Sequence, residues 1–342
     1  MLELDGSYGE GGGQLLRSAV ALSAITGRAI AIRNVRARRD KPGLAPQHLA
    51  AVKAVAALAG AEVEGAQLRS QSIRFSPRAL SGGGFRFDVG TAGSITLLLQ
   101  ALLPVMIASG EHCEAAVIGG TDVRMAPPLD YFREVLLTAL RRMGANVELR
   151  ILRRGYYPRG GGEVSIAVRP SPLAPLELDA PGGLQSVSGL AHVANLPEHI
   201  AERMRASALA ELKGLAVTPD IAVQTLGFDR AIGQGGAIVA WARTEHAVLG
   251  AGRVAERGVR AESLGEPVGR ELASDLAAGA TADLHAADQL LVYCALAGGG
   301  AFTAREVTLH AQTSMWLIEQ FLPVRFRVSQ TGALSRIAIV AR

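Results

Sequence analysis

His310 is the residue of this sequence whose type and surroundings best suit nucleophilic chemistry. It follows an alternating segment, residues 305–309, predicted as the end of a strand, and it precedes a helix predicted to start near Thr313. A neutral imidazole can attack phosphorus, and histidine is largely neutral near physiological pH. An isolated histidine at a strand end is more often a hydrogen-bonded surface residue, so its role depends on the loops predicted to lie around it.

A glycine-rich loop, residues 9–13, precedes the first predicted helix. Glycines at such a place let backbone N–H groups approach a phosphate at the start of a helix. The loop is neither a dinucleotide fingerprint nor a P-loop, because Gln14 stands at the closing position and no lysine follows such a loop. Glu10 would repel a phosphate unless a metal ion lay between them. A tight turn with a solvated glutamate is the alternative, and the motif alone leaves both open.

A basic loop follows the next predicted strand, and it contains Arg36, Arg38, Arg39 and Lys41. Such a run is usually a solvated hairpin tip. Gln47 and His48 at the start of the following helix add neutral donors, and this combination favours a phosphorylated chain end. Because only 4% of the residues are aromatic, stacking along a single strand is disfavoured. We expect a few backbone contacts at one RNA end.

Two further polar positions stand out within predicted helices. Gln100 lies in an apolar helix, where it is either a hydrogen-bonding core residue or a ligand contact. Asp288 and Gln289 stand at the predicted start of a later helix, where they could form a capping pair.

Composition limits the class of protein. The chain has 342 residues, of which 49% are hydrophobic and 19% charged, so we expect folded structure and two domains. The longest apolar run, residues 95–108, is too short to span a bilayer. The first residues lack the basic and apolar regions of a signal peptide, and Cys113 and Cys294 alone make neither a disulfide framework nor a zinc site. We therefore expect a cytoplasmic protein.

Three stretches of the chain share one plan: a loop, a helix, a strand, a second loop, a second helix and two closing strands. The first loops are residues 9–14, 90–94 and 287–289, and the second loops are residues 36–41, 119–122 and 310. The plan predicts an α/β (α+β) fold in which three repeated units, each of two helices on a small four-stranded sheet, pack around a shared core.

One segment, residues 181–279, lacks this plan and has its own alternation of strands and helices. It is predicted to be a smaller inserted α/β domain, with residues 1–180 and 280–342 forming the catalytic domain of three repeats. The insertion is typical of a lid or a substrate platform.

The motifs together resemble the RNA 3′-terminal phosphate cyclase family, in its true cyclase branch. The resemblance runs from residue 2 to the C-terminus and is weakest in the insertion. It is carried by Gly9-Glu10-Gly11-Gly12-Gly13-Gln14, Arg36-Ala37-Arg38-Arg39-Asp40-Lys41-Pro42-Gly43, Gln47-His48, Gly90-Thr91-Ala92-Gly93-Ser94, Gly119-Gly120-Thr121-Asp122, Ala126-Pro127-Pro128, Gly160-Gly161-Gly162-Glu163, Ala287-Asp288-Gln289 and His310 with Thr313.

This resemblance implies a ligase that forms a phosphoric ester bond (EC 6.5.1.4) with ATP as cosubstrate and a divalent metal, Mg²⁺ or Mn²⁺. The family's histidine attacks the α-phosphorus, releases pyrophosphate and becomes a covalent histidine–AMP. AMP then passes to an RNA 3′-phosphate, and the 2′-hydroxyl displaces it to give a 2′,3′-cyclic phosphate. The implied partner is RNA with a 3′-terminal phosphate; we expect no membrane and no obligate protein partner.

The resemblance also assigns residues to roles. His310 matches the nucleophile, and Glu10 matches the carboxylate near the metal and the phosphates. The ATP-binding positions are Glu10, Gln100, Pro127, Tyr131, His285, Asp288 and Gln289. The positions expected to bind phosphates or the RNA end are Arg17, Arg36, Arg39 and Gln47. His285 departs from the family, because tyrosine is frequent there; its ring can still stack on adenine.

Two other functions remain as alternatives. A non-catalytic, cyclase-like RNA-processing scaffold would lack the nucleophile, whereas His310 is present here. An enolpyruvyl transferase-like enzyme shares the repeated architecture and a glycine loop like residues 90–94, but it needs neither the histidine nor the basic loop.

Overall fold

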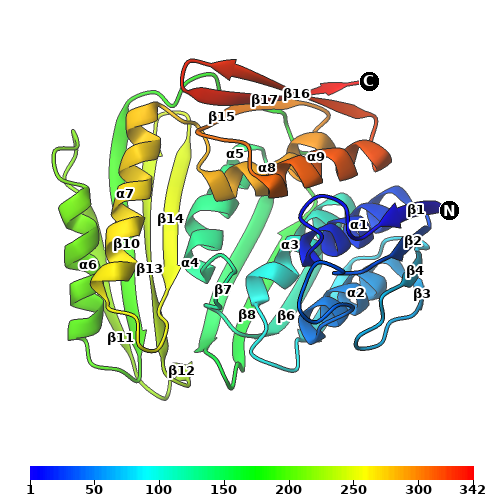
Figure 1. The fold of residues 1–342 in the computed structure, drawn as a ribbon, viewed down its shortest axis with the longest axis horizontal. Coiled ribbons are helices and arrows are strands. Elements are labelled where there is room, and N and C mark those ends of the chain that lie inside the picture. The colour runs from blue at the N-terminus through cyan, green and yellow to red at the C-terminus, as the bar shows by residue number, and fades with distance from the viewer.

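The computed structural model describes residues 1–342 and contains four sheets (Figure 1). Three of them share one topology. In each, four strands of one unit stand in the order first, second, fourth, third; the first two are parallel and the other pairs of the unit are antiparallel. The central sheet gains a fifth strand, β12 (Ala231–Ile232), from another part of the chain. The prediction of an α/β fold built on small four-stranded sheets is therefore confirmed.

The first unit forms the right side of Figure 1. Its sheet order is β1-β2-β4-β3. Its elements are β1 (Leu2–Asp5), α1 (Gly13–Thr26), β2 (Ile30–Arg33), α2 (Pro46–Ala59), β3 (Glu62–Glu64) and β4 (Ile73–Ser76). Both helices end at glycines in the left-handed conformation, Gly27 and Gly60, and α2 starts with a proline, whose missing N–H costs nothing there.

The second unit contributes the central sheet, in the order β7-β8-β6-β5. Its elements are β5 (Gly83–Asp88), α3 (Ile95–Ala108), β6 (Cys113–Gly119), α4 (Leu129–Tyr131), a π-helical turn (Phe132–Leu136), α5 (Leu137–Arg142), β7 (Asn146–Gly155) and β8 (Gly162–Arg169). Residues 129–142 are thus one helical stretch with a π-helical turn inside it.

The third unit lies at the top of Figure 1, in the order β16-β17-β15-β9. Its elements are β9 (Leu176–Glu177), α8 (Leu284–Leu296), β15 (Gly300–Ala304), α9 (Leu309–Phe321), β16 (Val324–Thr331) and β17 (Leu334–Ala341).

The third unit corrects two predictions about helix starts. α8 begins at Leu284, capped by Asp283, so Asp288 and Gln289 lie inside the helix and do not cap it. The strand expected up to residue 309 ends at Ala304, and α9 begins at Leu309 rather than near Thr313. His310 therefore lies in the first turn of a helix. The alternating segment resembled a strand, but the Thr308 side chain accepts from the N–H of Ala311 and starts the helix earlier.

The segment between β9 and α8 forms the left side of Figure 1. Its main sheet has the order β11-β10-β13-β14, with two helices on one face. Its elements are β10 (Leu184–Ala194), α6 (His199–Glu211), β11 (Asp220–Leu226), β12 (Ala231–Ile232), β13 (Gly235–Thr244), β14 (Val248–Val254) and α7 (Glu262–Ala278). The domain boundaries proposed at residues 180 and 279 stay a prediction.

Apolar burial divides the molecule in two. Seventy buried residues form one continuous core, all of them from the three units except Val239, Ala247 and Val248, and nineteen others, all but one from residues 187–280, form a second. The two parts are also joined by main-chain pairing, because β12 adds a parallel strand to β7. None of the helices combines the length and apolar character needed to cross a bilayer.

Candidate active site

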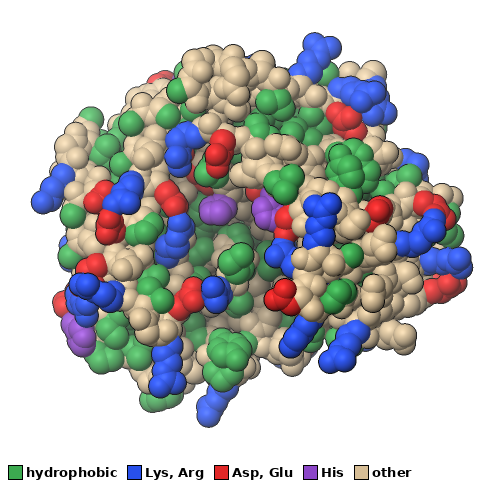
Figure 2. Space-filling model, in the orientation of Figure 1, with side chains coloured by type: hydrophobic (Ala, Val, Ile, Leu, Met, Phe, Trp, Pro, Cys, Tyr) green, Lys and Arg blue, Asp and Glu red, His purple; other side chains and the backbone are tan.

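His310 is held at the start of α9 by two neighbouring helices. The Thr308 hydroxyl caps α9 and donates to the Asp288 carboxylate of α8 at 2.6 Å. The His310 side chain is about half exposed, and Figure 2 shows histidine side chains in a hollow at the centre of the face. The side chain is thus fixed in place and open to a ligand.

One ring nitrogen of His310 is engaged and the other is free. Nδ1 is hydrogen-bonded to the side-chain oxygen of Gln14, whose amide nitrogen donates to the Ser314 hydroxyl at 2.9 Å. Because a carbonyl oxygen only accepts, Nδ1 carries the hydrogen of the neutral ring. The lone pair is then on Nε2, which makes no hydrogen bond and can act as a nucleophile.

The charges around His310 favour its neutral form. Burial lowers the pKa of His310, and the cations Arg17 and Arg39 lower it further, while Asp288 acts in the opposite direction. The net shift is downward, so the imidazole is neutral at physiological pH.

The glycine loop and the basic loop hold each other. Glu10 forms an ion pair with Arg39, and Arg38 donates to the carbonyl of Gly9 at 2.7 Å. The Glu10 carboxylate also lies 3.9 Å from Nδ1 of His310. No side chain caps the start of α1, so its first N–H groups remain available to an anion.

A close approach at the start of α1 requires glycine. A Cβ atom on Gly13 would lie 1.9 Å from Nε2 of His48. His48 is buried, and burial together with Arg17, Arg36 and Arg39 lowers its pKa to about 3. A neutral histidine therefore packs under the glycine loop, surrounded by cations.

Arg17 is the most unusual charge of the site. Its side chain is nine-tenths buried, it makes neither an ion pair nor a side-chain hydrogen bond, and burial lowers its pKa to about 10. A buried guanidinium without a partner is costly. It lines an open pocket between α1, α3, α8 and α9, with about 610 Å³ of space including the mouth. An anion entering this pocket would supply the missing counter-charge.

Three of the positions predicted to bind ATP lie on that same pocket: Gln100, Asp288 and Gln289. The Gln100 amide donates to Gln289 at 2.9 Å, and Gln289 donates to the carbonyl of His285 at 3.0 Å. Sequence reasoning left Gln100 open between core and ligand contact; it bonds a pocket residue and lines the pocket itself.

Besides Glu10, three more predicted ATP positions, Pro127, Tyr131 and His285, lie toward the insertion. Tyr131 is buried, its hydroxyl donates to Asp283 at 2.6 Å, and its ring meets the exposed His285 edge-on with centroids 6.0 Å apart. The Pro127 carbonyl accepts from Thr96 at 2.8 Å. The Tyr131 ring thus packs against His285, and the exposed imidazole of His285 is the ring that a nucleotide base could contact.

Two predicted phosphate-binding residues, Arg36 and Gln47, make their contacts within the basic loop and with Gly93. Arg36 donates to the carbonyls of Lys41 and Gly43 and so closes the basic loop. Gln47 lies beside Gly93, whose Cβ would be 3.1 Å from its own. The structure thus brings Glu10, Arg17, Arg39 and His310 together directly, with Arg36 and Gln47 at the edge of the group.

Sequence reasoning missed Gln14, Ser314 and Thr308 as parts of the site. Ser314 is four residues after His310 and lies on the same helix face, which the spacing could have indicated. Gln14 is 296 residues from His310, and no local pattern connects them.

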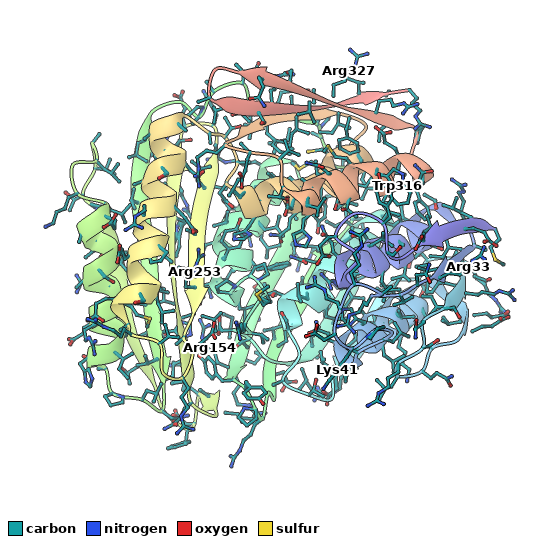
Figure 3. The ribbon with its side chains drawn as sticks, viewed as in Figure 1. Arg33, Lys41, Arg154, Arg253, Trp316 and Arg327 are labelled. Atoms are coloured by element: carbon teal, nitrogen blue, oxygen red, sulfur yellow. The ribbon has the colours of Figure 1, made fainter.

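A second polar cluster lies away from this pocket and is rich in potential metal ligands. Asp122, Asp130 and His192 place ligand atoms within 4.8 Å of one another. Arg154, labelled in Figure 3, fills the space between the carboxylates and donates to Asp122 at 3.1 Å and to Asp130 at 2.6 Å. The guanidinium already neutralises the carboxylates, so we interpret this cluster as structural.

Comparison with known proteins identifies the family. The RNA 3′-terminal phosphate cyclase family matches residues 8–328. A protein of Nitrosospira multiformis named RNA 3′-terminal phosphate cyclase is 56% identical over 98% of this chain and 96% of its own. One of that name from Pyrococcus furiosus is 44% identical over 96% and 95% of the two chains. This chain belongs to the RNA 3′-terminal phosphate cyclase family.

Proposed function

We propose that the chain is an ATP-dependent enzyme that converts an RNA 3′-terminal phosphate into a 2′,3′-cyclic phosphate. Family membership supports the overall reaction. The observation that carries the proposed mechanism is the arrangement of His310, whose Nε2 is free while Nδ1 is held by Gln14, beside the unpaired cation Arg17.

In the first step, Nε2 of His310 attacks the α-phosphorus of ATP. A P–N bond forms, the bond to the β-phosphate oxygen breaks, and pyrophosphate leaves. Arg17 and Arg39 lie near His310 and would offset the charge on the phosphates, as would the uncapped start of α1. Burial lowers the pKa of His310 and so favours the unprotonated nucleophile.

In the second and third steps, the adenylate moves to RNA and is then released. An oxygen of the RNA 3′-phosphate attacks the adenylate phosphorus, and the bond to Nε2 breaks. The neighbouring 2′-hydroxyl then attacks the 3′-phosphorus, loses its proton to solvent and displaces AMP. We assign no side chain as the base for this last step, because proximity on an activated phosphate contributes much of the rate.

A divalent ion, Mg²⁺ or Mn²⁺, fits the carboxylate of Glu10. Magnesium is usually bound through one or two carboxylates together with substrate phosphates, and Glu10 provides one such group 3.9 Å from Nδ1 of His310. When bound, the ion would offset the charge of the triphosphate. Glu10 would then exchange its ion pair with Arg39 for the metal and free that guanidinium for a phosphate. A cytoplasmic location stays a prediction.

The test uses ATP labelled at the α-phosphate, with a divalent ion and without RNA. After denaturing separation, we expect acid-labile label on the native chain and none on His310→Ala. His112→Ala, which changes an exposed histidine in the loop between α3 and β6, is the matched control and should keep the label.

The alternatives give different results. Absence of label on a folded native chain that binds ATP would refute the mechanism and favour the scaffold. Label on both the native chain and His310→Ala would show that another residue is the nucleophile. Turnover with phosphoenolpyruvate in place of ATP would instead indicate an enolpyruvyl transferase.

A further inference from the structure

Three loops from distant parts of the sequence meet at the lower edge of the molecule, where β12 joins β7 (Figure 1). They are residues 119–128, 155–162 and 227–233, and together with Arg153 we call them the loop rim. Backbone bonds connect them: Thr121 donates to Gly155 at 2.9 Å, Arg154 to Arg230 at 3.0 Å, and Tyr156 to Ile232 at 3.1 Å.

The loop rim carries the most exposed large hydrophobic side chains of the whole chain. Met125 is 86% exposed, Phe228 is 82% exposed and Tyr157 is 79% exposed. Scattered exposed apolar residues are ordinary. Here, however, the three side chains with the highest exposed fractions lie on three loops that are hydrogen-bonded to one another.

The same rim is positively charged. Its exposed side chains include Arg124, Arg153, Arg159 and Arg230, and the acidic residues of the three loops are Asp122, which is buried, and Asp229. Arg159 and Arg230 make no ion pair and no side-chain hydrogen bond, whereas Arg124 pairs with Glu256 at 3.4 Å. Figure 2 shows hydrophobic side chains beside Lys or Arg side chains along this lower edge.

The rim is continuous with the candidate active site. Met125 and Pro127 lie on one loop. A Cβ on Gly160 would lie 2.8 Å from the Cα of Ala92, and the next residue, Gly93, lies against Gln47. A chain bound with its end in the pocket could therefore pass over loops that touch one another as far as Tyr157.

We propose that the loop rim binds the RNA strand upstream of its 3′-phosphate, with bases stacked on Tyr157 and Phe228 and phosphates beside Arg159 and Arg230. The inference rests on the proposed function for the identity of the chain end. Exposed rings among unpaired cations are the combination that binds single strands with little sequence preference. Aromatic residues are few in this sequence, but the structure places two of them where the strand would leave the site.

The test compares two probes, a dinucleotide and a twelve-nucleotide RNA, each with a 3′-phosphate, by their dissociation constants at several salt concentrations. For Tyr157→Ala/Phe228→Ala we expect about a tenfold weaker affinity for the long RNA per ring removed. We expect the dinucleotide, which is too short to reach the rim, to bind as before. Arg159→Ala and Arg230→Ala should each lower the slope of log affinity against log salt by about 0.7 for the long RNA.

Matched controls come from β16. Val328→Ala and Arg327→Ala also remove an exposed apolar and an exposed basic side chain, and Figure 3 places Arg327 at the opposite edge of the molecule. Neither should alter the affinity for either probe.

Two results would overturn the inference. Equal affinity of the rim variant and the native chain for the long RNA would mean that the rim serves another partner, such as a protein. Equal losses for both probes would mean that the variant damaged the end site. Both results are independent of adenylate chemistry, whose failure would appear as absence of the protein–AMP adduct in the native chain.

Discussion

Two buried arginines, Arg17 and Arg154, have opposite environments. Burial disfavours the charged form of both. At Arg154 the carboxylates of Asp130 and Asp122 more than offset it, and the pKa rises above the usual value. At Arg17 no carboxylate compensates, and the pKa falls to about 10. A fold keeps an unpaired buried charge at a cost, so the unpaired one marks a place where a ligand brings the opposite charge.

The two clusters also differ in what they connect. The Arg154 cluster joins the second unit to the inserted segment through His192 of β10, which is hydrogen-bonded to the Tyr156 hydroxyl at 2.9 Å. Arg17 lies on an open pocket lined by residues of all three units. The Arg154 cluster holds two parts of the molecule together. Arg17, in contrast, offers its positive charge to a ligand that enters the pocket.

The largest expected effect comes from breaking the paired cluster. Arg154→Ala leaves Asp122 buried without its main counter-charge and should lower the free energy of unfolding by about 3–5 kcal/mol in urea titrations. Arg33→Ala, which breaks the exposed pair with Glu3, should lower it by less than about 1 kcal/mol. Equal losses for the two variants would contradict the structural interpretation of the cluster.

Acid should lower the stability of the fold through His48, which is buried near Arg17. The pKa of His48 is about 3 in the folded chain and near 6.5 when unfolded, so below pH 6.5 the unfolded state binds one more proton. Stability is therefore complete above pH 6.5 and falls as pH decreases toward 3. Between pH 7 and 4.5 we expect a loss of roughly 2–3 kcal/mol from this group.

The variant His48→Gln cannot take up that proton. It should lose less stability than the native chain between pH 7 and 4.5, measured by urea unfolding at both values. His112→Gln, at an exposed position, is the control and should follow the native chain. If His48→Gln showed the full acid sensitivity of the native chain, His48 would not be the buried neutral group that the geometry indicates.

Removing the unpaired charge should have two opposite consequences. Arg17→Met keeps much of the apolar stem and should raise the free energy of unfolding of the ligand-free chain by about 1 kcal/mol. Because the guanidinium is proposed to bind phosphates, the same variant should weaken ATP about tenfold or more, measured by calorimetry. Arg74→Met on β4 changes an exposed cation and should do neither. A loss of stability in Arg17→Met would place that residue with the paired cluster instead.

The sequence predicted the long helices well and the edge strands poorly. The sequence predicts helices over residues 46–59 and 95–108, and α2 and α3 have these bounds, because a proline start, apolar periodicity and a closing glycine or serine are all local. The first strand of every unit, β1, β5 and β9, was not predicted. These strands are short or glycine-rich, and β9 pairs with β15 from the far side of the whole insertion. Pairing across that separation leaves no local pattern.

The site shows the same limit. Residue types and motifs indicated His310, Glu10 and the basic loop, but not which nitrogen of the histidine is free. That depends on Gln14, from the other end of the chain. Composition does not distinguish Arg17 from the thirty-one other arginines. The family resemblance names it among the phosphate-binding positions, but only its burial and the absence of a carboxylate show that it lacks a partner.

The smallest expected effect is a shift in the pH midpoint of protein–AMP formation, which distinguishes the charges that act on His310. The rate of protein–AMP formation should fall as pH decreases through the pKa of His310, with a midpoint below the ordinary value near 6.5. Arg39→Gln removes a cation that disfavours protonation, so its midpoint should move upward by a fraction of a pH unit. Asp288→Asn removes the carboxylate that favours protonation, so its midpoint should move downward.

If the midpoints of Arg39→Gln and Asp288→Asn shift in opposite directions, the charges around His310 set its protonation, whatever either variant does to the maximal rate. Rates measured from pH 5 to 8 with labelled ATP give both midpoints, and Arg38→Gln, whose guanidinium is committed to the carbonyl of Gly9, should leave the midpoint unchanged. Movement of both midpoints in one direction would mean that the substitutions act by loosening the loop, not by changing charge.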